Sequence, residues 1–586
     1  MNSAQMIIKY WLKSRKDFVF ELIYLILSTI FYALTPVFIG RLIGGLDPNN
    51  SIISNFTDLV INFTFICIFA FLRYITNRAA RLRGSKVSSG AIYHLRKDIN
   101  NAINRQSFSY FDKIEIGQLI SRTTSDIEET QQIFGMGLIL GLQSSFSILG
   151  IIIGFFFYSL RFTLILIVII IISIIISYFI TKKLKPIFLE TRESFGELTN
   201  TIRENIIGAE VVRIFNTQEK ELNKFLKNNE KFLNASINTY KYNSLFTPIV
   251  YVIIGFLTTI ILLVGGISVI EGGMTLEALI VLQSYIALLG FPLMMIGQIM
   301  LVYIQADAAL TRAREVLESN PEIEDCKNPI KIKSLKGDIE FKNVSFGYIP
   351  GHKVLKGISF KVPAGKTLAI LGTTGSGKST IINLIPRFYD VNEGMIKIDG
   401  IDIRKYSLKD LRKNIGIVSQ ETFLFNKSIA ENIAFGVEKA SKEDIINAAK
   451  AAHLHDFIKT LPNGYDSIVG ERGTRLSGGQ KQRLTIARAL IVKPKILIFD
   501  DSTSSVDVET EYEIQKALAK LTKNTTTIII TQRISTIRNA DLILILDRGR
   551  VIGFGTHDEL IKSNPLYRQI YETLHQKQEL TIDVND

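Results

Sequence analysis

The chain has 586 residues, of which 47% are hydrophobic, and its mean hydropathy is +0.23. This length exceeds what one core supports and the hydropathy excludes an ordinary water-soluble protein, so part of the chain should lie in a membrane. The net charge of +13 argues little for nucleic-acid binding, because Lys and Arg gather in two segments between apolar runs and no basic–aromatic motif accompanies them. Cys67 and Cys326 support neither a disulfide framework nor a cysteine metal site.

The N-terminal residues 1–16 are basic and amphipathic and contain Trp11. They lead into an apolar run that is long enough to span a membrane, which argues against a cleavable secretory signal. We expect these residues to form a helix that lies along the inner membrane surface.

Six apolar runs are long enough to cross about 30 Å of hydrocarbon as helices. They cover residues 18–42, 57–72, 134–158, 162–181, 245–270 and 278–304. The connections 44–56 and 271–277 hold no Lys or Arg, whereas 73–132 and 182–241 hold many. Because basic loops stay on the cytoplasmic side, both termini are expected in the cytoplasm, and the protein is expected to be a multi-pass protein of the cell (inner or plasma) membrane.

The two basic connections are helical in pattern, so the membrane helices should continue into the cytoplasm. Residues 109–122 and 204–215 interrupt these extensions and predict short transverse helices. We therefore predict a six-helix, all-α membrane domain over residues 1–317.

A stretch with prolines and mixed charges, residues 318–336, predicts a linker. Strand-like runs then alternate with helical stretches, which is typical of an α/β domain with a largely parallel sheet. We place this domain at residues 337–575 and a solvated tail at 576–586.

A glycine-rich stretch lies where the apolar run 367–371 meets a helical pattern. This context predicts a P-loop of a P-loop NTPase, in which backbone N–H groups surround phosphates, Lys378 contacts the outer phosphates and the Ser379 hydroxyl ligates Mg²⁺. The predicted ATP-binding residues here are Gly372, Thr373, Thr374, Gly375, Ser376, Gly377, Lys378, Ser379 and Thr380.

About a hundred residues later, Leu476, Ser477, Gly478, Gly479 and Gln480 open a helical pattern. This stretch resembles the signature of ATP-binding cassette (ABC) proteins. In that family two cassettes dimerise head to tail, so the resemblance implies that this signature contacts the γ-phosphate of an ATP held by a partner. It also implies that the α/β domain is an ATP-binding cassette on the cytoplasmic side.

The resemblance assigns further roles. Tyr348 corresponds to the aromatic residue that stacks on adenine, and Gln420 to the glutamine that senses Mg²⁺. Asp500 ends a strand similar to the Walker B strand and would act on Mg²⁺ through water. The implied Mg²⁺ site is thus Ser379, Gln420 and Asp500.

Two positions depart from the family pattern. Asp501 stands where the family has the glutamate that polarises the attacking water, and Gln532 stands at the switch histidine. The shorter Asp501 side chain withdraws its carboxylate, and Gln532 cannot carry a positive charge. The predicted catalytic residues Asp500, Asp501 and Gln532 therefore indicate a degenerate ATP site.

Residues 111–126 and 204–215 resemble the cytoplasmic loops of ABC exporters, where they form coupling helices. The resemblance as a whole implies one half of an exporter, paired with a second half-transporter that is a different chain with an intact catalytic glutamate. Two alternatives stay open: a homodimeric exporter with slow hydrolysis, and an ATP-gated channel or regulatory subunit.

The expected substrate is a small amphiphilic or hydrophobic molecule. Few charges interrupt the apolar runs, and polar or aromatic side chains are scattered along them, although each is equally compatible with helix packing. These residues are Tyr24, Tyr32, Gln143, Tyr251, Gln283, Tyr285 and Gln298.

Overall fold

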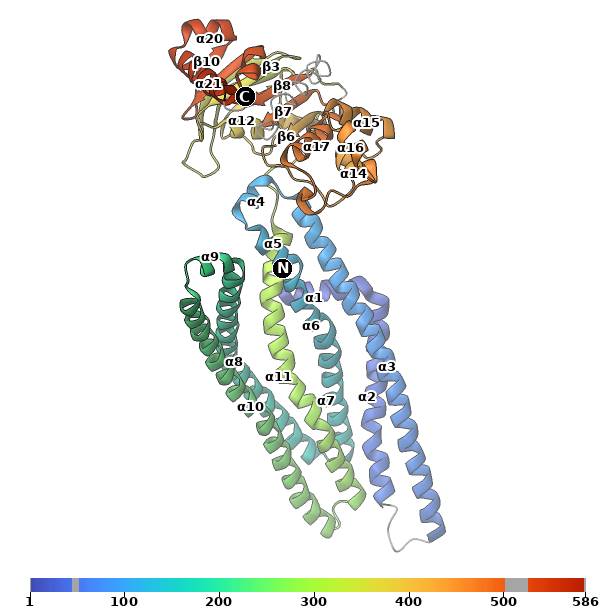
Figure 1. The fold of residues 1–586 in the computed structure, drawn as a ribbon. Helices are drawn as coiled ribbons and strands as arrows, with labels where there is room; N and C mark the ends of the chain where they lie inside the picture. The colour runs from blue at the N-terminus through green and yellow to red at the C-terminus, as the bar shows by residue number, and fades with distance from the viewer. Residues whose placement is uncertain (1, 45–51, 333, 501–524, 584–586) are drawn as a thin grey trace. The chain divides into compact units, whose positions relative to one another are not determined.

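The computed structural model describes residues 2–44, 52–332, 334–500 and 525–583. The chain divides into two compact units (Figure 1). The membrane unit comprises Met1–Arg105 and Glu115–Ser319, and the sheet unit comprises Gln106–Ile114 and Asn320–Asp586. A short segment between two membrane helices thus packs with the sheet unit.

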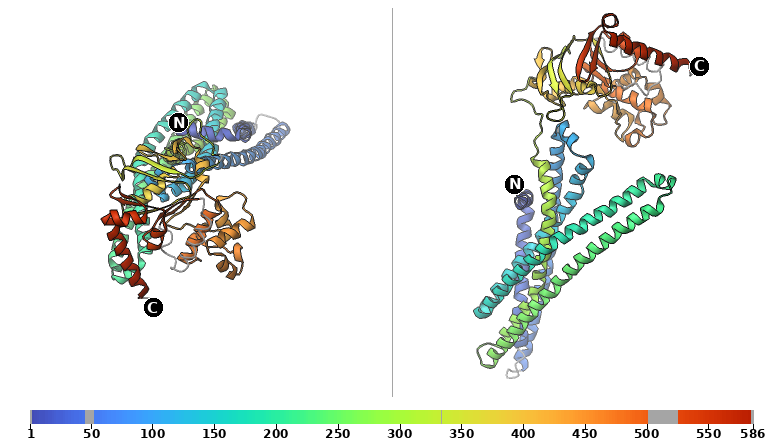
Figure 2. Two further views of the ribbon diagram at one scale, coloured as in Figure 1. Left: turned by 90° about the horizontal axis from the view of Figure 1, so that it is seen from above. Right: turned by 90° about the vertical axis from the view of Figure 1, so that its left-hand side faces the viewer.

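Six helical segments of the described chain are long and apolar enough to span a membrane, as the six apolar runs predict. Two further views show that α8 and α10 run side by side over their length (Figure 2). The helices that carry the spans are α2 (Arg15–Gly44), α3 (Ile52–Arg105), α7 (Leu138–Tyr158), α8 (Leu160–Ile207), α10 (Gln218–Ile270) and α11 (Leu276–Glu318).

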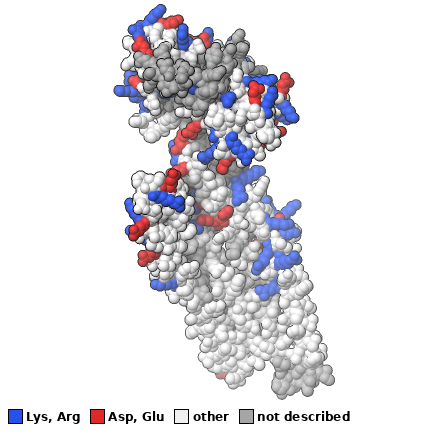
Figure 3. Space-filling model, viewed as in Figure 1, with Lys and Arg blue, Asp and Glu red and all other residues white. Residues whose placement is uncertain are grey.

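Several of these helices continue far beyond their apolar runs, since α3 has 54 residues and α10 has 53. The predicted extensions are therefore present. On the visible face of the membrane unit, charged side chains gather over these extended ends and are sparse along the spans (Figure 3). This distribution is what a bilayer requires of the apolar segments.

Short helices lie where the sequence interrupts the extensions. They are α4 (Phe108–Lys113), α5 (Ile116–Thr123), α6 (Ser125–Gln132) and α9 (Ala209–Ile214). A π-helical turn, Ile133–Gly137, joins α6 to α7.

The N-terminal helix α1 (Ser3–Trp11) forms where predicted, but its apolar face is used differently. Met6 and Tyr10 are buried in one cluster with Leu95 of α3, Phe134 and Leu310 of α11. The apolar stripe thus packs on the protein's own helices, because small and aliphatic residues there leave room for it. Only the side chains on the opposite face of α1 are therefore free to contact a membrane surface.

The sheet unit contains two sheets in its described part. The larger sheet has the order β10-β9-β3-β8-β7-β6, and its strands are parallel except β10, which is antiparallel to β9. The largely parallel α/β prediction is confirmed. The bounds are β3 (Thr367–Gly372), β6 (Ile415–Val418), β7 (Ile496–Asp500), β8 (Thr526–Ile530), β9 (Leu542–Asp547) and β10 (Arg550–Gly555).

The smaller sheet is antiparallel, in the order β2-β1-β4-β5. Its strands are β1 (Ile339–Phe346), β2 (Leu355–Val362), β4 (Glu393–Ile398) and β5 (Ile401–Asp402). The helices of the unit are α12 (Lys378–Leu384), α13 (Leu408–Lys413), α14 (Ile429–Ile433), α15 (Lys442–Ala451), α16 (His455–Thr460), α17 (Gly478–Leu490), α19 (Ile534–Asn539), α20 (His557–Ser563) and α21 (Pro565–Asp583).

Candidate nucleotide site and transmembrane cavity

The predicted P-loop connects β3 to α12. The central residues of β3 are buried, which fixes the strand in the middle of the sheet, and the loop leaves from its carboxyl end. Gly377 has φ +103°, and a Cβ there would lie 2.6 Å from Leu355 Cδ2. Glycine is therefore required at this position both by the backbone conformation and by the space available.

Lys378 lies across this loop. Its Nζ donates hydrogen bonds to the carbonyl oxygens of Gly372 and Thr373, each at 2.9 Å. Ser376 is buried, and its hydroxyl has no hydrogen-bond partner among the described residues. The loop thus presents an ammonium group, a spare hydroxyl and successive backbone amides, which together suit a phosphate group.

A pocket of about 280 Å³ opens beside the P-loop. It gathers predicted residues from four separate segments: the loop, the end of β6, the end of β7 and the end of β8. Its lining is Val354, Thr374, Gly375, Gly377, Lys378, Ser379, Thr380, Gln420, Asp500, Ile530, Thr531 and Gln532. Val354, Ile530 and Thr531 were not predicted, because an aliphatic or hydroxyl residue at a strand end carries no signal of its own.

Three oxygen-bearing side chains in this pocket are those predicted for Mg²⁺. The hydroxyl of Ser379, the amide of Gln420 and the carboxylate of Asp500 all line it. Oxygen donors are the ligands that Mg²⁺ prefers, so these residues fit the ion. Gln532 lines the same pocket, whereas Asp501 lies outside the described residues.

Tyr348 stands next to the pocket and is 43% exposed. Its hydroxyl donates to Thr380 Oγ1 at 3.3 Å, and its ring meets Phe346 and Tyr389 edge to face. An exposed ring held from behind in this way is suited to stack on a base.

Tyr389 connects this aromatic group to α4. Its hydroxyl donates to Asp112 Oδ2 at 2.7 Å, while Phe108 of α4 stacks on Phe388 with ring centroids 4.1 Å apart. Burial, and then the hydrogen bond to Asp112, raises the pKa of Tyr389, so its proton stays in place. The first predicted coupling helix is thus in contact with residues that border the nucleotide pocket.

The predicted signature residues Ser477, Gly478, Gly479 and Gln480 do not line the pocket. Ser477 caps α17: its Oγ accepts from the Gln480 N–H at 3.3 Å, and Gln480 Oε1 accepts from the Ser477 N–H at 3.0 Å. This capping box fixes the start of α17 but leaves the signature apart from the P-loop of the same chain.

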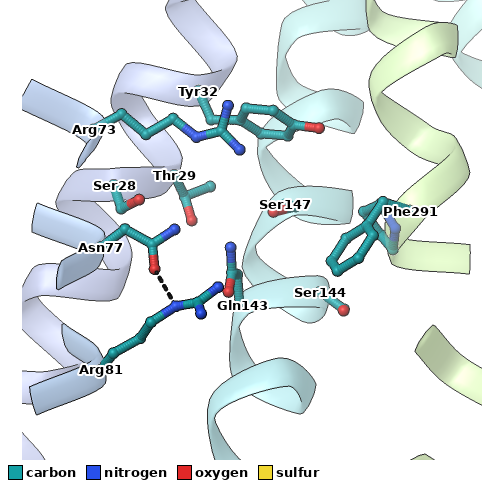
Figure 4. A pocket seen from close by; sticks show the side chains of 11 residues that line it. Ser28, Thr29, Tyr32, Arg73, Asn77, Arg81, Gln143, Ser144, Ser147 and Phe291 are labelled. Atoms are coloured by element: carbon teal, nitrogen blue, oxygen red, sulfur yellow. Dashed lines mark hydrogen bonds between the residues drawn. The ribbon is translucent and has the colours of Figure 1, made fainter. Parts of the chain in front are cut away.

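A second pocket, of about 240 Å³, lies in the membrane unit between α2, α3, α7 and α11 (Figure 4). Of the polar residues singled out in the spans, Tyr32 and Gln143 line it. Tyr285 and Gln283 instead bond across the bundle, to the carbonyl oxygens of Ala33 at 2.7 Å and Thr258 at 3.1 Å. Tyr24, Tyr251 and Gln298 do not line it either.

This cavity is more polar than the sequence predicts, because α3 adds Arg73, Asn77 and Arg81. Their spacing of four residues places them on one face of the helix. This four-residue spacing is visible in the sequence. It begins just after the apolar run 57–72, however, so the sequence pattern assigns the three residues to the cytoplasmic loop.

The fold and the site together define a class: a helical membrane-spanning domain fused in one chain to a P-loop NTPase domain. Comparison with known proteins gives the family. Residues 18–293 match the ABC transporter transmembrane region, and residues 355–504 match the ABC transporter model. The chain therefore belongs to the ABC transporters.

Similar proteins indicate the type of ABC transporter to which the chain belongs. The chain is 38% identical over 486 residues to an ATP-dependent lipid A-core flippase of Desulfotalea psychrophila, covering 83% of this chain and 85% of that protein. It is 35% identical over 530 residues to the putative multidrug export ATP-binding/permease protein YgaD of Bacillus subtilis, covering 90% and 91%.

The solved structure of a bacterial Atm1-family ABC exporter with ATP bound superposes with a TM-score of 0.84 at 27% identity, covering 95% of this chain and 98% of that chain. The chain is thus an exporter-type half-transporter, a multi-pass membrane protein whose cytoplasmic cassette binds ATP.

Proposed function

We propose that this chain exports amphiphilic or hydrophobic compounds as one half of a heterodimer, in which its own ATP site is degenerate. The observation that carries the proposal is Gln532, which lines the pocket with Lys378, Ser379 and Asp500 at the position of the family's switch histidine. A neutral amide there donates a hydrogen bond to the γ-phosphate but adds no positive charge in the transition state. In the sequence, Asp501 stands where the family has a glutamate, and its shorter side chain reduces the reach of the general base.

The roles of the other residues follow from their chemistry. P-loop amides and Lys378 bind the phosphates, and Tyr348 stacks on adenine. Ser379, Gln420 and Asp500 would hold Mg²⁺, which would neutralise negative charge on the phosphates. The substrate class rests on two relatives, one a lipid A-core flippase and one a putative multidrug export protein.

Two features support a dimer. The signature lies outside the pocket of its own chain, so it is available to a second cassette. The tip between α8 and α10 also exposes large apolar side chains, with Ile214 69% and Phe215 71% exposed. Apolar side chains gathered at such a tip favour burial against a partner. ATP then closes the two cassettes, and the coupling helices transmit that motion to the membrane helices.

ATPase measurements on the purified full chain test the proposal. We expect almost no activity from the lone chain, and activity that depends on the partner's glutamate when a partner half-transporter is co-expressed. The combined substitutions Asp501→Glu and Gln532→His should raise the activity of the lone chain by about a hundredfold, since a misplacement of about 1 Å costs on that order.

A matched control is Gln569→His, which makes the same chemical change on the exposed surface of α21 and should leave activity unchanged. If the unmodified lone chain hydrolyses ATP at roughly ten per second or more as a stable homodimer, a typical rate for an intact enzyme, the degenerate-site proposal is wrong.

A further inference from the structure

We infer that the transmembrane cavity binds an anionic group, a phosphate or a carboxylate, of the molecule that the protein transports. This inference rests on the proposed export function and specifies its substrate class. It comes from the side chains that four helices bring together in Figure 4.

The cavity lies at membrane depth. Ser28, Thr29 and Tyr32 come from the middle of the apolar run 18–42, and Phe291 comes from the middle of the run 278–304. Charged side chains are costly at this depth and are retained where they face a cavity or a partner.

Two arginines nevertheless face this space. The Arg73 guanidinium lies 4.0 Å from the centre of the Tyr32 ring, and Arg81 Nε donates to Asn77 Oδ1 at 3.2 Å. The lining contains no Asp or Glu, and neither arginine belongs to an ion pair of the described residues. By contrast, the nearby Arg83, which does not line the cavity, pairs with Asp17 at 2.6 Å.

The contacts of the two arginines leave most of their N–H donors unused. Each guanidinium has five N–H groups in a planar fork. The Tyr32 ring beside Arg73 and the single Asn77 oxygen bonded by Arg81 satisfy few of these donors. A phosphate or carboxylate oxygen pair matches this fork and is its strongest partner.

An independent observation comes from the opposite wall. Ser144 of α7 is only 3% exposed, and its hydroxyl has no hydrogen-bond partner among the described residues, nor has Gln143 Oε1 beside it. Both residues line the cavity together with the arginines, and Figure 4 shows Arg81 pointing toward Gln143. Buried polar atoms without partners are rare in folded proteins, so a ligand that hydrogen-bonds here accounts for them.

The cavity also has an apolar wall, which would contact an apolar part of the ligand. Phe291 and Pro292 of α11 form the remaining wall, and the cavity holds about 240 Å³. This volume accommodates a head group and part of a chain, so the ligand is an amphiphile, and the two arginines in the lining favour an anionic head group over a cationic or neutral one.

The test is a binding measurement on the full chain in nanodiscs of neutral phosphatidylcholine. The probe is dodecyl phosphate with a fluorophore at its chain end, competed with unlabelled dodecyl phosphate, dodecyltrimethylammonium and glycerol phosphate. We expect dodecyl phosphate to compete and the cation to fail. Equal competition by glycerol phosphate would identify a free anion as the ligand, whereas failure of glycerol phosphate would identify an anionic amphiphile.

Substitutions locate the binding. Arg73→Gln and Arg81→Gln should each weaken probe binding by about tenfold, because each removes charge-assisted hydrogen bonds, and Arg81→Lys should restore part of the loss. The matched control is Arg78→Gln, which removes the same charge from the same helix at an exposed position outside the cavity. ATP binding by each variant reports whether it has folded.

The inference is overturned if the cation competes as well as dodecyl phosphate, or if a variant that combines Arg73→Gln with Arg81→Gln binds the probe as tightly as the unmodified chain. Loss of binding in Arg78→Gln equal to that in Arg81→Gln also overturns it. ATP-dependent transport of the probe into vesicles, with the partner present, is measured as a separate experiment. If transport occurs but probe binding does not depend on the two arginines, this inference alone is wrong. If binding depends on the arginines but no ATP-dependent transport occurs, the proposed export function is wrong.

Discussion

The nucleotide pocket and the transmembrane cavity both collect hydrogen-bond donors, but they are built in opposite ways. In the nucleotide pocket, six lining residues come from the single segment Thr374–Thr380, and all the others except Val354 lie at strand ends of one sheet. In the cavity, single side chains of α2, α3, α7 and α11 meet from positions up to about 260 residues apart. A donor set made from one loop tolerates changes in distant packing, whereas a set made from four helices depends on how those helices pack.

We expect the largest effect from a substitution that disrupts the nucleotide pocket and leaves the transmembrane cavity intact. Lys378→Met removes the ammonium group that lies over the loop, so ATP affinity should fall about 10- to 100-fold, in line with one or two charge-assisted hydrogen bonds. Binding of dodecyl phosphate in the membrane unit should not change. Fluorescent ATP titration measures the first effect and the nanodisc assay the second.

Lys356→Met is the control for this variant, since Lys356 is an exposed lysine of β2 outside the pocket. A parallel loss of dodecyl phosphate binding in Lys378→Met would contradict the separation of the two sites.

A substitution in the membrane unit should have a smaller effect and should alter the transmembrane cavity without altering the nucleotide pocket. A Cβ at Gly154 of α7 would overlap the ring of Tyr285 of α11, whose hydroxyl bonds to Ala33 of α2. Gly154→Ala should therefore displace three helices that line the cavity and cost about 1–3 kcal/mol of stability. Thermal unfolding and probe binding measure this change, and ATP affinity should stay the same.

The control for Gly154→Ala is Gly266→Ala on α10, where an added Cβ would meet no atom of the described residues within 4 Å apart from its own helix backbone. If both variants lower the melting temperature equally, close packing at Tyr285 is not the cause.

The smallest expected effect concerns the base-stacking ring. Tyr348→Ala should weaken ATP binding about 3- to 10-fold, since an aromatic contact contributes roughly 0.5–1.5 kcal/mol beyond its buried area. Tyr348→Phe should retain most of the affinity, because the hydroxyl makes only a long bond of 3.3 Å to Thr380. Equal losses in the two variants would show that the hydroxyl, and not the ring, matters.

The six spans, the α/β class of the second domain and the residues of the P-loop could be predicted from the amino-acid sequence alone. These follow from local rules: an apolar run must be about 20 residues long to cross a bilayer, and a glycine-rich loop between a strand and a helix holds its residues together wherever the fold places it. Gln420, Asp500 and Gln532 are assigned through the resemblance to ABC proteins. They reach one pocket because each lies at or just after the end of a strand of the same sheet, and parallel strands end at the same edge.

The roles of the scattered polar residues in the spans could not be predicted, because they depend on how the helices pack together. Tyr32 and Tyr285 look alike in the sequence, yet one lines the cavity and the other joins α11 to α2. Likewise Arg73 and Arg81 read as loop residues until α3 is seen to continue past its apolar run beside α2 and α7. The physical reason is that helix periodicity gives the face of each residue but not the neighbour that this face meets, and that neighbour is chosen by packing across the whole bundle.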